Sequence, residues 1–220
     1  MPTSKKMELA GLLASRGIPL IEDDPSGDLY FTSGTTRPST CISLDRGDNV
    51  IYCSSFSKTV APNLRLGWIV SRRWHDQIEQ LIQLANHGMS TIPQIAMALL
   101  LEDGFLPRHL RKTRVALRSR VPAAREAILS AFPAGTRVSD PSGGVSLWVT
   151  LPEGRSSQDL YKRALAAGIL VAPGFLFGES SRHETSFRLN GSVLTAKDAA
   201  TLGALATEIE PTPAAKLTDQ

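Results

Sequence analysis

The sequence predicts an α/β protein, and two observations support this fold class. Residues 4–16 show a helical pattern that is followed at once by an apolar strand pattern at residues 18–21, and such a pair is half of a crossover unit that favours a parallel sheet. Helical and strand patterns alternate again after Thr136, which indicates a second, smaller α+β domain. A chain of 220 residues is long enough for one large domain or two small ones.

The composition argues against several classes of protein. Hydrophobic residues make up 42% of the chain and charged residues 20%, and a formal net charge of +3 does not by itself indicate a nucleic-acid partner. Cys41 and Cys53 do not form a C-x-x-C motif, which argues against a disulfide framework and a cysteine zinc site. Because the sequence shows neither an apolar run of membrane-spanning length nor a signal-peptide pattern, a cytoplasmic protein without a membrane partner is expected.

Motifs of several other enzyme classes are missing from the sequence. There is no G-x-S-x-G, H-E-x-x-H, Walker A or G-x-G-x-x-G pattern. No metal site is expected either, since the four histidines are scattered without metal-ligand spacing: His75, His87, His109 and His183.

The first helix and strand lead to a cluster of acids. Ser4 is the expected N-cap of the helix at residues 4–16, and Gly17 is its expected stop. The following strand ends in Glu22-Asp23-Asp24. Acids at the carboxyl end of a parallel strand lie where α/β sheets bind ligands, although a charged exit from a strand is a common alternative. Residues 29–46 then show the composition of a surface loop.

Residues 50–70 hold a single lysine between two apolar runs. Lys58 follows a predicted buried strand and lies among small hydroxyl residues that include Ser55 and Ser57, while Arg65 lies in the second apolar run. A lysine between buried strands is costly to desolvate, so it requires an ionic partner or a functional role. Its neutral amine is a nucleophile suited to a Schiff base. Hydroxyl groups and an arginine fork suit a phosphate. The alternative is a surface loop with one solvated lysine.

Helical patterns fill the middle of the chain, at residues 73–84, 94–102 and 107–132. Pro122 is expected to kink or interrupt the last of these helices. This helix also carries a basic stripe of Arg111, Arg114, Arg118 and Arg125. Such a stripe can bind phosphates, but a solvated face or acidic partners in the same subunit explain it better.

The smaller domain is expected to alternate strands and helices. The strands are predicted at residues 136–139, 145–151, 169–172 and 186–190, and the helices at residues 158–167 and from the cap Thr195 to about residue 209. Arg188 lies between apolar residues of the last strand and therefore requires a carboxylate partner. That partner is either an Asp or Glu of the protein or the α-carboxylate of a bound amino acid.

The residues around Lys58 match a known motif. Ser55 to Gly67 reads S-x-S-K-x-x-x-P-x-L-R-x-G, which resembles the lysine motif of fold-type I pyridoxal-phosphate enzymes in the class I/II aminotransferase branch. The resemblance implies that Lys58 holds pyridoxal 5'-phosphate as a Schiff base and acts as general base in transamination between an amino acid and an oxo acid. It also implies that Ser55, Ser57 and Arg65 hold the cofactor phosphate.

Residues 21–29, IEDDPSGDL, resemble the family segment that contacts the cofactor ring. Asp23 matches the aspartate that pairs with the pyridine nitrogen, and a carboxylate there keeps the ring protonated as an electron sink. Ser26 stands at a cofactor-binding position where the family usually has a tyrosine, whose phenol donates to the ring oxygen. Serine is too short to reach the same point.

The second domain extends the resemblance through its G-G-x-x-L-W, A-P-G and F-R-L-N elements. In the last of these, Arg188 matches the arginine that binds the substrate α-carboxylate. The string I-Y-C-S-S-F-S-K-T around Lys58 and the F-R-L-N ending are most similar to the aminotransferase-like domain of GntR/MocR-type transcription regulators. In those proteins the cofactor would serve as a ligand sensor, so an effector-sensing domain is the alternative to an enzyme.

The resemblance covers the C-terminal half of a family member. It implies a partial large domain with a mostly parallel sheet at residues 1–104 and a small α+β C-terminal domain with its linking helix at residues 105–210. Residues 211–220 are small and polar, which predicts a disordered tail. Met1-Pro2-Thr3-Ser4 resembles the family's N-P-T-G turn, so a truncated or nonfunctional form is expected. A full-length relative would be a homodimer, and it would bind DNA only if a helix-turn-helix domain came first.

Overall fold

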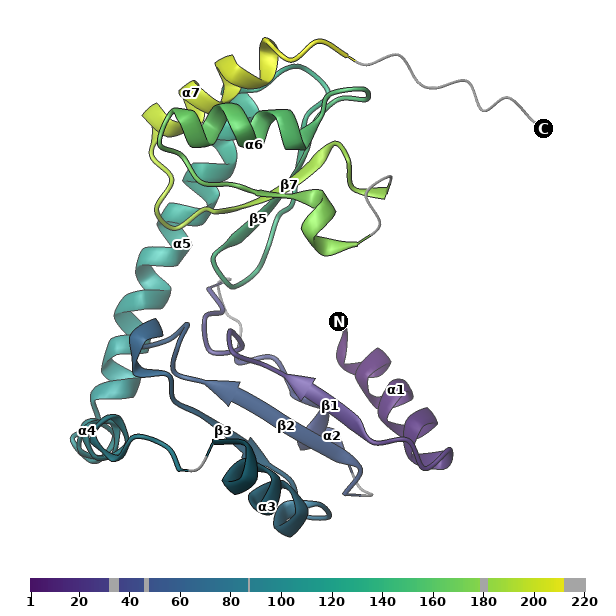
Figure 1. Cartoon of the computed structure of the whole chain (residues 1–220), viewed down its shortest axis with the longest axis vertical. Coiled ribbons are helices and arrows are strands. Elements are labelled where there is room, and N and C mark those ends of the chain that lie inside the picture. The colour runs from purple at the N-terminus through teal and green to yellow at the C-terminus, as the bar shows by residue number, and fades with distance from the viewer. Residues whose placement is uncertain (32–35, 46–47, 87, 179–181, 212–220) are drawn as a thin grey trace. The chain divides into compact units, whose positions relative to one another are not determined.

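The computed structural model describes residues 1–31, 36–45, 48–86, 88–178 and 182–211 (Figure 1). The chain divides into two compact units, Met1–Arg114 and Val115–Gln220, and the division falls inside one long helix, α5 (Phe105–Ala131).

The first unit is a small three-stranded sheet with helices around it. Its elements are α1 (Thr3–Ser15), β1 (Leu20–Asp23), α2 (Cys41–Leu44), β2 (Val50–Ser55), the 3-10 turn η1 (Pro62–Leu64), β3 (Gly67–Val70), α3 (His75–Asn86), α4 (Thr91–Glu102) and the first turns of α5. The strand order is β1-β2-β3. β1 runs parallel to β2, as the helix–strand pattern predicts, and β3 runs antiparallel to β2.

Helix starts in the first unit differ from the sequence expectation. Pro2, rather than Ser4, is the N-cap of α1, and the helix already begins at Thr3. α4 begins at Thr91 and therefore includes Pro93 in its first turn. A proline is tolerated there because the first amide groups of a helix have no partner within the helix.

Pro122 was expected to kink or interrupt the long helix, and the expectation of an interruption is wrong. α5 continues without a break from Phe105 to Ala131. A proline inside a helix costs about 3 kcal/mol, but the neighbouring residues Val121 and Ala124 keep only 1% and 3% of their surface exposed. Burial on both sides of the proline offsets this cost.

The second unit contains a four-stranded antiparallel sheet covered by helices. Its elements are the rest of α5, β4 (Arg137–Val138), β5 (Ser146–Thr150), α6 (Ser157–Ala166), β6 (Ala172–Pro173), the 3-10 turn η2 (Gly174–Phe177), β7 (Ser186–Asn190) and α7 (Ala196–Thr207). The strand order is β4-β5-β7-β6. The strand expected at residues 169–172 is reduced to β6, since only Ala172 and Pro173 pair with β7.

The second unit encloses a dense core. Ile128, Leu147, Phe187 and Leu202 come from α5, β5, β7 and α7, and each has at most a trace of exposed surface. Gly203 lets α7 approach α5 closely, because a Cβ at this position would overlap the carbonyl group of Ala131. The two helices therefore pack backbone to backbone at this point.

The predicted cap of the last helix is confirmed. The Thr195 hydroxyl accepts a hydrogen bond from the Asp198 amide, and the Asp198 carboxylate accepts one from the Thr195 amide, which forms a capping box. All of the expected tail beyond residue 211 lies outside the described residues. None of the helices in the described ranges combines the length and apolar character that a membrane span requires.

Candidate functional site

A single tight turn carries Lys58 at the end of β2. The Phe56 carbonyl accepts hydrogen bonds from the amides of Val60 (2.8 Å) and Ala61 (3.1 Å), and the Phe56 amide donates to the Leu66 carbonyl (3.0 Å). These bonds close residues 56–61 into one helical turn, which we call the lysine turn. The Lys58 side chain is exposed at this turn rather than buried between strands, so its amine is accessible to a ligand.

The second half of the motif, residues 62–67, forms a return loop to β3. The geometry of this loop explains which residue types the motif requires. Arg65 adopts the left-handed conformation (φ 50°, ψ 35°) at the end of η1. Two residues later, Gly67 passes so close to β2 that a Cβ would lie 2.6 Å from the Ser54 carbonyl oxygen. Any other residue would push β3 away from β2, which explains the glycine of the motif. The rings of Phe56 and Trp68 pack 4.7 Å apart and join the two ends of the loop.

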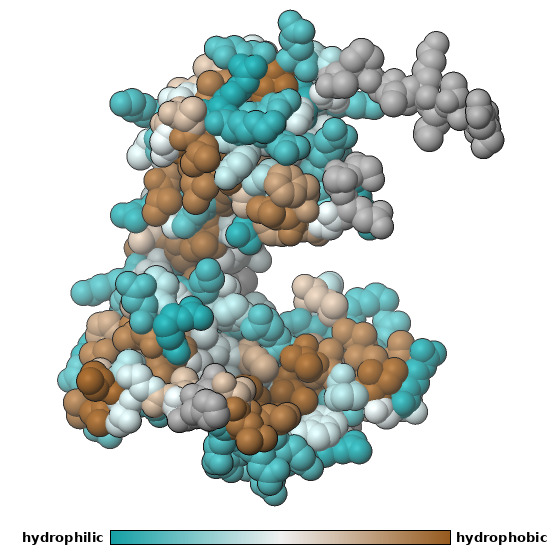
Figure 2. Space-filling view, viewed as in Figure 1, coloured by the Kyte–Doolittle hydropathy of each residue, from teal (hydrophilic) through white to brown (hydrophobic). Residues whose placement is uncertain are grey.

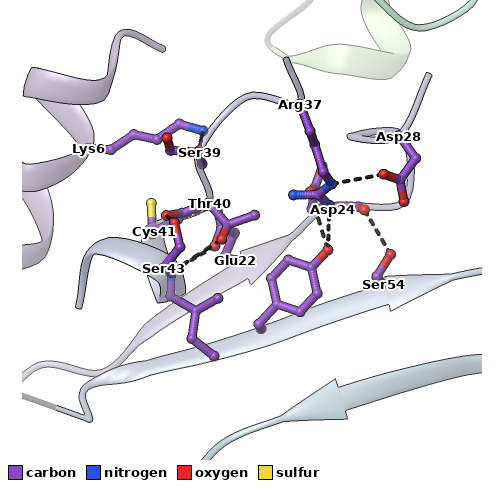
Figure 3. Close-up of polar contacts among 12 residues, drawn as sticks. Lys6, Glu22, Asp24, Asp28, Arg37, Ser39, Thr40, Cys41, Ser43 and Ser54 are labelled. Atoms are coloured by element: carbon purple, nitrogen blue, oxygen red, sulfur yellow. Dashed lines mark hydrogen bonds and ion pairs between the residues drawn. The ribbon is translucent and has the colours of Figure 1, made fainter. Parts of the chain in front are cut away.

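The three acids at the end of β1 and directly after it have different environments, and Figure 3 shows two of them, Glu22 and Asp24. Glu22 accepts hydrogen bonds from the amides of Cys41 (2.8 Å) and Ile42 (3.2 Å) and so anchors the start of α2. The Asp24 carboxylate accepts hydrogen bonds from Arg37 (2.8 Å) and Tyr52 (3.3 Å). Asp23 lies between them in an extended strand and is exposed, and side chains alternate in direction along such a strand.

Asp23 is therefore the acid that is available to a ligand. Its carboxylate has no hydrogen bond or ion pair with any residue of the described part of the chain. In the sheet it is paired with Cys53, just before the lysine turn. Burial raises the pKa of the Cys53 thiol, and the negative charge of Asp23 raises it further.

An arginine that the sequence did not single out organises the other face of this region. Arg37 donates to Asp28 (2.9 Å) as well as to Asp24, and it also donates to the Tyr52 hydroxyl (3.0 Å), as Figure 3 shows for the two acids. Burial lowers the pKa of Arg37, but the hydrogen bonds and charges of Asp28 and Tyr52 outweigh it and raise the pKa overall. We call Asp24, Asp28, Arg37 and Tyr52 the Arg37 network. A Cβ on Gly27 would overlap the Asp24 carboxylate, so the turn after β1 is shaped around this network.

Two arginines of the basic stripe of α5, Arg114 and Arg125, have partners within the protein. Arg114 donates to the Asp28 carbonyl (2.8 Å) and lies 4.2 Å from the centre of the Tyr30 ring. Arg125 contacts Glu126 and Asp140. These contacts agree with the expectation of acidic partners in the same subunit.

A histidine that the sequence treated as scattered contacts the lysine turn. The Nε2 atom of His109, on α5, lies 2.8 Å from the Thr59 carbonyl oxygen. Thr59 directly follows Lys58 and is 8% exposed. A separation of fifty residues gives no local sequence signal for this contact.

The sequence-predicted residues of the first unit lie on two neighbouring segments. Asp23 and Ser26 belong to the end of β1 and the turn after it. The end of β2, the lysine turn and the return loop form the second segment, which carries Lys58 and the possible phosphate ligands Ser55, Ser57 and Arg65. Within the described ranges, none of these six side chains forms a hydrogen bond or an ion pair. Ser26 is half-buried, and its carbonyl accepts a hydrogen bond from the Leu29 amide (2.9 Å).

This donor set fits pyridoxal phosphate by its chemistry. An accessible amine suits an aldehyde, an unpaired carboxylate suits a protonated ring nitrogen, and hydroxyl groups with a guanidinium suit a phosphate. The two segments lie at the carboxyl ends of the parallel strands β1 and β2, which is where α/β sheets bind ligands. No group of three or more His, Cys, Asp or Glu side chains in the described ranges is placed to hold a metal ion.

Arg188 belongs to the second unit and is exposed on β7. Its guanidinium lies 4.9 Å from the centre of the Phe177 ring, and Phe177 in turn packs edge-on against Trp148 at 5.2 Å. No Asp or Glu in the described part of the chain forms an ion pair with Arg188. The ring occupies one face of the guanidinium, so the N–H groups in its plane are free for a carboxylate.

Comparison with known proteins agrees with the site. The family model described as "Aminotransferase class I and II" matches residues 2–204. The HTH-type transcriptional regulator YdcR of Escherichia coli is 34% identical over 186 residues, which are 84% of this chain and 39% of the regulator. The 2-aminoadipate transaminase of Thermus thermophilus is 30% identical over 199 residues, which are 88% of this chain and 49% of the transaminase.

Solved structures show the same fold. The α-aminoadipate aminotransferase LysN of Thermus thermophilus, crystallised with N-(5'-phosphopyridoxyl)-L-leucine, superposes with a TM-score of 0.84 at 29% identity, over 94% of this chain and 54% of LysN. The chain spans 39% to 49% of the length of the two curated relatives above. It belongs to the class I and II aminotransferase family and has the fold of part of a fold-type I enzyme.

Proposed function

We propose that this chain forms the lysine-bearing part of a pyridoxal-phosphate-dependent aminotransferase that acts on an amino acid. The observation that supports this most is the set of unpaired side chains at the carboxyl ends of the paired strands β1 and β2, with the exposed Lys58 in the turn after β2 and the exposed, unpaired Asp23 at the end of β1. The family and the phosphopyridoxyl ligand of LysN support the same cofactor.

The chain's own residues have separate tasks in this proposal. Lys58 binds the cofactor aldehyde and moves a proton to and from the substrate Cα. Asp23 holds a proton on the ring nitrogen. Ser55, Ser57 and Arg65 would bind the phosphate and so fix the orientation of the ring, and Ser26, in the turn after β1, would be a further cofactor contact. When bound, the cofactor supplies an electron sink for the Cα carbanion.

The α-carboxylate of the amino acid is assigned to Arg188. A guanidinium with one face on an aromatic ring and its edge free is suited to a bidentate carboxylate contact. The proposed assembly is a homodimer in the whole protein, and the proposed location is the cytoplasm.

The second candidate is the effector-sensing domain of a GntR/MocR-type transcription regulator. The likeness to YdcR favours it, because this HTH-type regulator is 34% identical to the chain. In that case the same residues would bind the cofactor and an amino acid as signals, with little turnover, and a DNA-binding domain would precede Met1 in the gene. An in-frame helix-turn-helix upstream would favour the regulator, whereas a free-standing aminotransferase half would favour the enzyme.

The test is a cofactor titration of the purified chain, followed by borohydride reduction and peptide mapping. We expect the reduced cofactor on Lys58 and its loss in Lys58→Ala. Lys6 serves as the control lysine, since its amine donates to the Ser39 carbonyl (2.6 Å). Labelling that persists in Lys58→Ala, or that maps to another lysine, would refute the assignment.

We expect the chain alone to bind the cofactor with an affinity weaker than about 1 μM. Ser26 stands where the family usually has a tyrosine that donates to the ring oxygen, and the chain spans only 39% to 49% of the length of its two curated relatives. Each charge-assisted hydrogen bond is worth about 1.5–3 kcal/mol, and a micromolar affinity corresponds to about 8 kcal/mol. Tight stoichiometric binding, with conversion of the cofactor to its amine form by an amino donor, would contradict this expectation.

A further inference from the structure

Within the lysine turn, no amide group donates a hydrogen bond to the carbonyl of Thr59. Residues 56–61 form a single turn that closes on the Phe56 carbonyl, and the last carbonyls of a helical turn have no acceptor role within it. Thr59 is 8% exposed, so water does not readily solvate its carbonyl. A buried carbonyl without a hydrogen bond is costly.

His109 supplies the missing partner. A carbonyl oxygen accepts and never donates, so the 2.8 Å contact from His109 Nε2 to Thr59 O requires a proton on Nε2. The ring is held from both sides along α5. Phe105 stacks on it with the ring centres 5.1 Å apart, and the Thr113 hydroxyl lies 3.4 Å from the same Nε2 atom.

We propose that His109 is a positioning residue for Lys58. Its Nε2–H group caps the lysine turn through the Thr59 carbonyl and ties the turn to α5. It thereby fixes the backbone from which the Lys58 side chain projects. The role of Lys58 rests on the proposed function, but the capping contact does not, and the two can be tested separately.

Two variants separate the hydrogen bond from the packing. His109→Gln keeps an N–H donor at a similar distance from the backbone, whereas His109→Leu keeps an apolar side chain beside Phe105 and has no donor. Both residues favour helices, so both variants preserve α5. His75→Gln is the matched control, because His75 is exposed on α3 and has no hydrogen bond within the described part of the chain.

The first readout is amide hydrogen exchange of the lysine turn, measured on peptides that contain Val60 and Ala61 in the chain without cofactor. We expect His109→Leu to exchange there about tenfold faster than the wild type, the factor that corresponds to one net hydrogen bond. His109→Gln should stay within about threefold of the wild type, and peptides from the second unit should not change. Equal protection in the Leu variant and the wild type would overturn the proposal, as would a Gln variant that behaves like the Leu variant.

The second readout is the fraction of Lys58 labelled by pyridoxal phosphate and borohydride under limiting cofactor. We expect a several-fold loss in His109→Leu and recovery in His109→Gln. If the wild type is not labelled at Lys58, the proposed function fails while the exchange result still decides the capping role. If the wild type is labelled and the Leu variant is labelled equally, the positioning role is wrong.

Discussion

The two compact units differ in how they bury apolar surface. Among the described residues, side chains with no measurable exposure occur only in the second unit, for example Ile128, Leu160 and Phe187. In the first unit, large apolar side chains are often exposed, and the strand residue Ile21 keeps 66% of its surface and the α4 residue Ile92 keeps 80%. Figure 2 shows apolar surface gathered over α4 and beside β1.

This difference shows which kind of interaction stabilises each unit. The second unit has a conventional apolar core, whereas the first depends more on polar contacts such as the Arg37 network and the cap of the lysine turn. In the described part of the chain, β1 forms an edge of the sheet, with one neighbour only. An open edge and exposed apolar helices are surfaces that another chain can cover.

The largest expected effect is self-association through the first unit. We expect the purified chain to form aggregates or to require a partner, as measured by sedimentation velocity. Replacing both Ile92 and Ile95 by serine should reduce association without lowering the free energy of unfolding, since these side chains are 80% and 56% exposed. A monodisperse wild-type monomer that unfolds cooperatively would remove the contrast between the units.

The second prediction tests the core of the second unit. Phe187→Ala should lower the free energy of unfolding by about 3–5 kcal/mol, because it leaves a cavity at a side chain with 0% exposure. Leu170→Ala is the control, and with 75% of its surface exposed it should cost less than about 0.5 kcal/mol. Urea unfolding followed by circular dichroism measures both values, and equal costs would show that the core is looser than described.

The third prediction tests how much the Arg37 network contributes to the stability of the first unit. Arg37→Ala removes the partner of Asp24 and Asp28 and should cost about 1–2 kcal/mol, a value reduced for partial solvent screening because these side chains are 23% to 33% exposed. Arg72→Ala breaks a pair with Asp48 in which the arginine is 85% exposed, and it should cost less than about 0.5 kcal/mol. Urea unfolding of the two variants, with tyrosine fluorescence as a probe, would show no difference if the network contributed nothing.

The smallest expected effect concerns the cap of α7. Thr195→Ala should cost about 1 kcal/mol of stability through loss of the N-cap. The side-chain and backbone hydrogen bonds of Thr195 lower the pKa of the Asp198 carboxyl, so this group stabilises the fold above its ordinary pKa and the contribution is lost as the pH falls through the lowered value. In Thr195→Ala the pKa should rise toward its ordinary value, which a carboxyl titration by NMR measures. An unchanged pKa would refute the assigned cause.

Local pattern predicted much of this structure. The apolar runs around Lys58 became β2 and β3, and Thr195 caps its helix as expected. The continuous helix through Pro122 could not be predicted, because burial of its neighbours offsets the local penalty. The pattern of three acids marked a ligand edge and the family resemblance singled out Asp23, while the structure showed that Glu22 and Asp24 have partners of their own.

Some residues of the site could not be identified from the sequence, because their contacts join segments that are far apart in the chain. Arg37 lies in a stretch rich in small polar residues that predicts only a loop, and His109 is fifty residues away from the carbonyl it contacts. Neither has a periodicity or a spacing that would mark it. The roles of Lys58, Asp23, Ser26, Ser55, Ser57, Arg65 and Arg188 stay predictions, as do the domain bounds at residues 104 and 210.

The parallel pairing of β1 with β2 has a consequence for the order of folding. Ser55 pairs with Gly67, close in sequence, whereas Leu20 pairs with the distant Val50. Closing a longer loop costs more entropy and slows pairing, so we expect β2 and β3 to join before β1 docks. Asp23 would then reach the lysine turn last, and the ligand groups would be complete only at the final step. Pulse-labelling exchange during refolding tests this order, which is wrong if amides of β1 gain protection before those of β3.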